Sequence, residues 1–173
     1  WDGWISVSNP LKKGQVKDLY HTVYFEHVEN LSGQRLSRYV STDLLEARTQ
    51  SNLSFRLGFD HFIEHIESPF TLIENWTIPA ADYRFSHWRV NAETDHSQDV
   101  FVSATLESGD FFNAKMRFTE IEGQWNISQY LQWSIAWGQR RFSATDHTSA
   151  VKTYSTKLQW AMDTRLSWHN WLQ

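Results

Sequence analysis

The segment His61-Phe62-Ile63-Glu64-His65 has the residue types and spacing of a zinc site. The order H-x-x-E-H is that of inverted zinc metalloproteases, in which a helix presents both histidines to the metal. On a helix, His61 and His65 would share a face and could bind Zn²⁺, with Glu64 as general base. On a strand, Glu64 would point to the face opposite both histidines.

The residues around this motif favour the strand. Upstream, Leu53, Phe55, Leu57 and Phe59 alternate with polar or small residues, and Pro69 closes the segment soon after the second histidine. A second feature, the helical spacing of Phe59, Phe62, Ile63 and Ile66, keeps the helix as an alternative. No downstream acidic ligand completes a zinc site. We therefore expect His61, Glu64 and His65 at a water-facing strand end, and they remain the only metal candidates.

Three segments alternate large apolar residues with small or polar ones, over 53–60, 131–140 and 151–163. The aromatic residues at the apolar positions are Phe55, Phe59, Trp133, Trp137, Tyr154 and Trp160. The polar residues that alternate with them include Arg56, Ser134, Arg140, Lys157 and Gln159. Successive strand side chains point to opposite faces, so each segment has one aromatic wall and one polar wall. This pattern is typical of transmembrane β-barrels. We predict that the aromatic set faces lipid or its interface and that the polar set faces the lumen.

The sequence predicts an all-β fold, an antiparallel meander that forms a transmembrane β-barrel of about 8–10 strands, with part of a larger barrel as the alternative. The predicted strands are 4–8, 18–29, 36–49, 52–63, 83–94, 98–108, 114–126, 129–142, 150–163 and 165–173. Alternation is poorer over 18–29 and 36–49. The connection 64–82 is apolar for a loop, and we expect it to fold onto the rest of the protein.

Length and composition set further limits. The chain has 173 residues, ten of them Trp, a net charge of −4 and no Cys. It is read as a single β-barrel domain over 1–173. Because it starts at Trp1 without a Met or a signal segment and ends within a predicted strand, we expect a fragment of a longer chain. It contains no run of about 18 apolar residues, so no spanning helix is expected. No Lys/Arg cluster with interleaved aromatics suggests nucleic acid as a partner.

Several motifs between 55 and 173 occur in an order that resembles a known family. They are Ser68-Pro69-Phe70, then 78–85 (IPAADYRF), then 108–112 (SGDFF), and finally the closing 166–173 (LSWHNWLQ). They resemble the C-terminal outer-membrane-type barrel of a bacterial uncharacterised family that carries an N-terminal family-9-like carbohydrate-binding domain. The family usually has Gly where this chain has Ala81. The resemblance implies an outer-membrane barrel associated with carbohydrate binding.

Three classes of function remain. The first is a bacterial outer-membrane barrel, or barrel segment, with a structural, transport or surface-anchoring role. Its partners would be outer-membrane lipid and, as further options, other barrel strands, a partner chain or carbohydrate. The second is a soluble all-β module, lipocalin-like or a sandwich, that binds a ligand or carbohydrate. The third is an enzyme, for which the inward carboxylates Glu93, Glu107 and Glu122 are the remaining candidates. No cofactor is expected, and no catalytic residue is assigned.

Overall fold

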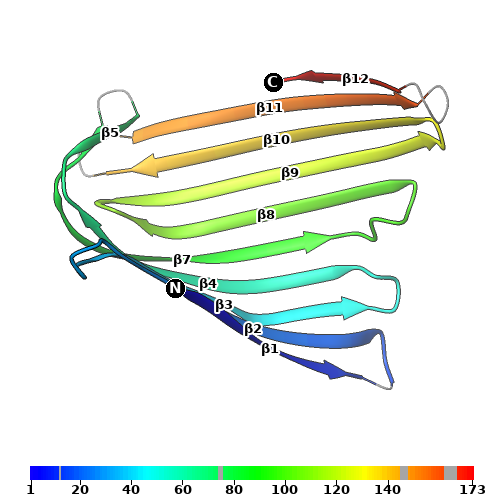
Figure 1. Cartoon of the computed structure of the whole chain (residues 1–173). Coiled ribbons are helices and arrows are strands. Elements are labelled where there is room, and N and C mark those ends of the chain that lie inside the picture. The colour runs from blue at the N-terminus through cyan, green and yellow to red at the C-terminus, as the bar shows by residue number, and fades with distance from the viewer. Residues whose placement is uncertain (12, 74–75, 145–147, 162–166) are drawn as a thin grey trace.

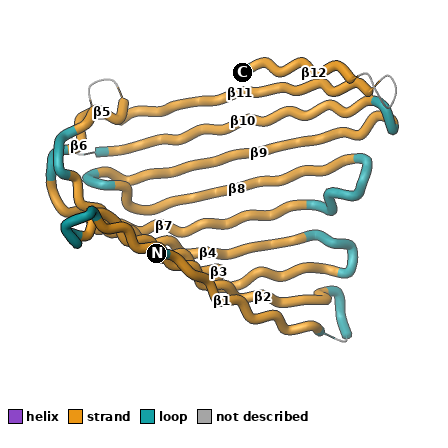
Figure 2. Tube along the Cα trace, in the orientation of Figure 1, coloured by secondary structure: helices purple, strands orange, loops and turns teal. Residues whose placement is uncertain are grey.

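The structure is a computed structural model that describes residues 1–11, 13–73, 76–144, 148–161 and 167–173. A ten-stranded antiparallel sheet contains β1 (Asp2–Pro10), β2 (Val16–Glu29), β3 (Arg35–Thr49), β4 (Ser54–Ile66), β7 (Ala81–Glu93), β8 (Val100–Phe111), β9 (Ala114–Ser128), β10 (Leu131–Ser143), β11 (Thr148–Ala161) and β12 (Ser167–Leu172). A separate hairpin contains β5 (Phe70–Ile73) and β6 (Trp76–Ile78). The described elements are all strands (Figure 2). None of the described residues forms a helix long and apolar enough to cross a membrane.

The sheet is a curved trough in which neighbouring strands follow chain order (Figure 1). The prediction of an all-β antiparallel meander is therefore confirmed. A closed barrel is not formed by the described residues: β1 pairs with β2 and β12 pairs with β11, and no pairing joins these two outer strands. Each of them keeps one edge of its backbone open.

The ten strands of the sheet coincide with the ten predicted segments, and most are longer at one or both ends. The ends of the predicted strands 150–163 and 165–173 fall partly on residues 162–166, outside the described residues. The poor alternation over 18–29 and 36–49 has a physical cause. The pairing of β2 with β3 shifts register at three places, and that of β3 with β4 shifts between Asp43 and Leu45. A β-bulge adds one residue to a strand, so the alternation of side chains between the two faces of the sheet changes phase beyond the bulge.

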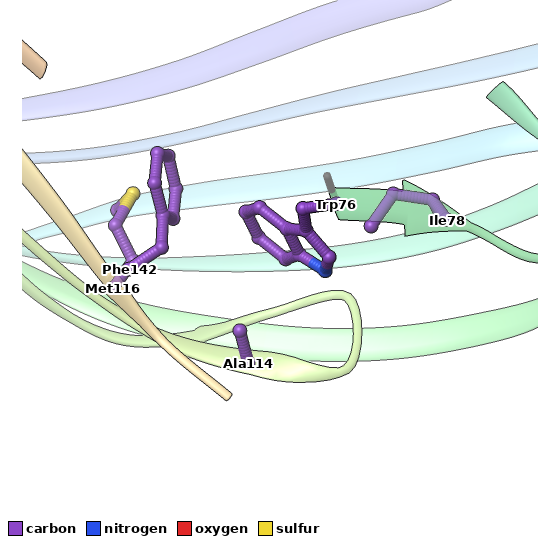
Figure 3. Close-up of a cluster of buried hydrophobic side chains, with 5 residues drawn as sticks. All are labelled: Trp76, Ile78, Ala114, Met116 and Phe142. Atoms are coloured by element: carbon purple, nitrogen blue, oxygen red, sulfur yellow. The ribbon is translucent and has the colours of Figure 1, made fainter. Parts of the chain in front are cut away.

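The apolar connection after β4 folds as expected. Its β5–β6 hairpin reaches across the end of the sheet and lies near the ends of β10 and β11 (Figure 1). Trp76 and Ile78 pack there on Ala114, Met116 and Phe142 (Figure 3). Ile78 is fully buried and Trp76 is 6% exposed. The largest hydrophobic cluster of the described residues thus lies at one end of the trough, under the hairpin, and not along its length.

Candidate functional site

Strand register determines which residues share a face. One row of cross-strand partners runs from Phe55 on β4 through Ala92, Ala104 and Ile121 to Trp137 and Tyr154 on β11. Because side chains alternate along each strand, every second residue counted from this row lies on the same face. All six predicted aromatic positions fall on this face, and the five predicted polar positions fall on the other.

The aromatic face is the convex one, because side chains of strands that are not neighbours, such as Arg89 on β7 and Asp43 on β3, meet on the opposite face of the curved sheet. The aromatic face is also widely exposed. Phe55, Trp133, Tyr154 and Trp160 are exposed, whereas Phe59 and Trp137 are half-buried; these are the six predicted aromatic positions. Further exposed apolar residues join them into one band, namely Ile5, Val7, Val23, Trp88, Val100, Val102, Leu106, Ile121, Trp125, Ile127 and Ile135. We call this surface the apolar band. Apolar patches on monomeric soluble proteins rarely exceed a few hundred Å², so a band that crosses nearly every strand is unusual for a water-facing surface.

The concave face is polar and more buried. Of the predicted polar residues there, Arg56 donates from Nε to Glu46 Oε2 at 3.2 Å, and Arg140 lies over the Phe118 ring at 4.5 Å from its centroid. The remaining three lie along β10 and β11. Ser134 is the direct cross-strand partner of Lys157, and the Gln159 side chain is 3.0 Å from His169 Nδ1. Arg56, Arg140 and Gln159 therefore have side-chain contacts within the trough.

A network of ion pairs crosses three strands, β3, β4 and β7, on this wall. Asp43 on β3, Gly58 on β4 and Arg89 on β7 are consecutive cross-strand partners. Because Gly58 has no side chain, the Arg89 guanidinium reaches over it and donates from Nη2 to Asp43 Oδ1 at 3.0 Å. A Cβ at position 58 would lie 2.9 Å from Arg89 Nη2. The glycine therefore makes room for a contact between β7 and β3, which are not neighbours in the sheet.

Asp60 is the most buried member of this network, at 2% exposed. Tyr39 donates its hydroxyl to Asp60 Oδ1 at 2.9 Å, and His87 Nε2 and Arg89 Nη1 lie 3.4 and 3.8 Å from Oδ2. A buried carboxylate needs such partners because an unpaired charge is expensive to remove from water. Sequence reasoning placed Asp60 on the polar wall of β4 but gave no sign of its partners, because they come from strands distant in the chain.

The zinc motif is divided between the two faces. His61 and His65 point to the convex side and Glu64 to the concave side, as alternation on β4 requires. His61 Nδ1 lies 2.7 Å from Ser86 Oγ, and His65 Nδ1 lies 2.8 Å from Asp82 Oδ1. Among the described residues, no group of three or more His, Cys, Asp or Glu side chains could hold a metal ion. The helical alternative for this segment was wrong.

Aromatic rings close the concave side at the hairpin end. Tyr39 stacks on Phe62 and Phe62 on Phe85, with ring centroids 4.6 and 5.0 Å apart. Phe85 continues the row to the pair Phe111 and Phe112. Phe111 then meets Phe142, and the hairpin residue Trp76 lies 5.0 Å from Phe142. The predicted connection 64–82 thus adds Trp76 to a row of rings that comes mostly from the strands of the sheet.

The opposite end carries a polar link between two turns and the start of β2. Asn52, between β3 and β4, donates from Nδ2 to Asp95 Oδ2 at 2.7 Å and accepts a hydrogen bond from Lys17. Asp95 also accepts from the Ser97 backbone N–H at 2.9 Å. The Asn52 hydrogen bond, followed by the bonds from Ser97, lowers the pKa of Asp95 to about 2. This carboxylate therefore fixes the β7–β8 turn to its neighbours in its ionised form.

The three carboxylates named as enzyme candidates also lie on the concave wall, where their cross-strand neighbours differ. Glu107 is the cross-strand partner of Arg89, and Glu93 lies 4.0 Å from His96. Glu122 is exposed, opposite Ala136. Their different partners give the wall mixed charge.

No family model, curated protein or solved structure matches the chain. The resemblance to the C-terminal barrel of the carbohydrate-binding-associated family therefore stays a prediction from its motifs.

Proposed function

We propose that the protein is a bacterial outer-membrane β-barrel, or a barrel segment of one, with a structural or surface-anchoring role. The observation that carries the proposal is the polarity of the sheet: its apolar band is convex and exposed, and its charged network is concave and partly buried. A water-soluble protein has the opposite distribution. Burying one large apolar side chain contributes about 1.5–3 kcal/mol, so a band of this size strongly favours contact with hydrocarbon.

The same polarity weighs against the soluble alternative. A lipocalin-like or sandwich module would turn Trp133, Ile135 and Trp137 inward, towards a ligand cavity or a second sheet. In the described residues this side of β10 is convex, and Ile135 is 51% exposed. The side that lines the trough carries Arg56, Arg89 and their carboxylate partners instead, which suits a lumen in contact with water.

An anchoring role fits the trough better than an open pore. The aromatic row and the β5–β6 hairpin fill the concave side at one end, where a pore would need a water-filled mouth. In lipid, every backbone polar group must be paired. The outer edges of β1 and β12 therefore need partners, either each other or further strands from the same or another chain.

The proposal is tested with single-cysteine variants, since the chain contains no Cys. A nitroxide label would be placed in turn at positions 132–137 of protein folded into lipid vesicles. We expect collision with oxygen, which partitions into lipid, to peak at 133, 135 and 137. Collision with a polar nickel reagent should peak at 132, 134 and 136. Exchanged peaks, or a chain that stays monomeric in water without lipid or detergent, would refute the proposal.

A further inference from the structure

Basic side chains gather on the convex face beyond one end of the apolar band. We call Lys115, Arg117, Arg141 and Lys152 the basic patch. These residues come from β9, β10 and β11, and all four are exposed. Arg117 and Arg141 are direct cross-strand partners. Arg141 is flanked diagonally by the other two, because Lys115 faces Ser143 and Lys152 faces Gln139.

The pairing of Arg117 with Arg141 is unfavourable by itself. Like charges directly opposite each other destabilise a strand pair. The nearby described acid, Asp110, is already paired with Lys115, and neither arginine has an ion-pair partner among the described residues. Both arginines line a surface hollow of about 440 Å³ together with Ser108, Lys115 and Ser143. An anion in this hollow would remove the repulsion and would meet hydroxyl as well as guanidinium donors.

The position of the patch indicates the source of that anion. On β10 and β11 the apolar band ends at the cross-strand pair Trp137 and Tyr154, and Lys152 lies two residues beyond Tyr154. The opposite ends of β9, β10 and β11 carry no Lys or Arg on the convex face in the described residues. The patch also lies at the end that bears the β5–β6 hairpin (Figure 1). In outer-membrane barrels the longer connections are extracellular, which would put the patch at the outer leaflet.

We infer that the basic patch binds the phosphate groups of a lipid headgroup, of the class of phosphorylated glycolipids in the outer leaflet. The inference rests on the proposed membrane location. Guanidinium groups match phosphate oxygens with two parallel hydrogen bonds. Long basic side chains can lie along apolar surface and place their charge at headgroup level. The aromatic residues just below would contact the first part of the acyl chains.

The test uses the full chain folded into neutral phosphatidylcholine vesicles, with or without lipopolysaccharide as the probe. The variant is the double substitution Arg117→Gln and Arg141→Gln. The control is Arg140→Gln, which removes a neighbouring charge from the concave side. Binding of lipopolysaccharide is measured by titration, and the unfolding midpoint by heat-modifiable gel mobility. An attraction of about fivefold per arginine predicts that the double variant binds lipopolysaccharide about 25-fold more weakly than the wild type. The control should bind like the wild type.

The neutral vesicles supply a second readout. Without lipopolysaccharide, the double variant should be at least as stable as the wild type, because the arginine repulsion is gone. Equal lipopolysaccharide affinity for wild type and double variant would overturn the inference and leave the membrane location intact. Equal stabilisation by soluble pyrophosphate would also overturn it, because the site would then take free phosphate. If the chain does not enter vesicles at all, the proposed function and this inference both fail.

Discussion

Replacing Ile135 by arginine is the sharpest test of which face meets lipid. Ile135 lies in the middle of the apolar stretch 131–137 of β10 and is 51% exposed. Its cross-strand partners, Gly123 and Thr156, carry no charge that could neutralise an arginine. An arginine on the lipid face costs about 2–4 kcal/mol at mid-depth. Since folded proteins are stable by only about 5–15 kcal/mol, Ile135→Arg should remove a large part of the unfolding free energy.

The two neighbouring residues provide controls at the same depth on the concave face. Ser134→Arg would add a cation opposite the exposed Lys157, and Ala136→Arg would place one opposite Glu122. In a water-filled lumen such exposed charge pairs change stability by at most about 1 kcal/mol. Urea unfolding of vesicle-folded protein, followed by heat-modifiable mobility, measures all three variants. Equal losses of unfolding free energy in the three variants would refute the assigned orientation. So would a larger loss in Ala136→Arg than in Ile135→Arg.

Three further predictions concern the concave side and the turns. Trp76→Ala should lower the local stability of the hairpin by about 3–5 kcal/mol, seen as faster proteolysis within 67–80 with unchanged strand content by circular dichroism; unchanged cleavage would contradict the packing. Asp60→Ala, which leaves buried donors unpaired, should cost about 1–3 kcal/mol in urea unfolding, and Asp60→Asn clearly less; the reverse order would contradict the network. The pKa of Asp95 falls from 3.8 to about 2 on folding, so its ionised form favours the folded state above pH 3.8 and this contribution is lost as the pH falls towards 2. The thermal midpoint of wild type should therefore fall over this range more than that of Asp95→Asn, and parallel curves would contradict it.

The ion-pair network shows how a polar inner wall can be both charged and well ordered. Asp43 and Asp60 hold Arg89 between them, and Glu46 holds Arg56 beside them. Each charge therefore has a partner from an adjacent strand or the next one. Such pairing ties β3, β4 and β7 together next to the stacked rings of Tyr39, Phe62 and Phe85 on the same face.

The sequence by itself determined the strands and the division of their residues between two faces. A two-residue period depends only on backbone geometry, so it can be read without knowing the neighbours. That is why Trp133 and Ser134 could be assigned to opposite faces, and why the H-x-x-E-H motif could be expected to split. The same logic failed across Asp43 and Leu45, because a bulge depends on the pairing of two strands and not on one strand alone.

Tertiary structure decided which groups meet. Arg89 reaches Asp43 because register places Gly58 between them, and Arg117 meets Arg141 because β9 and β10 pair in one alignment out of several. The burial of Trp76 on Phe142 likewise needed the path of the hairpin across the sheet. These contacts join residues far apart in the chain, and local periodicity carries no information about them. Curvature, finally, decided that the tryptophan-rich face is the outer one.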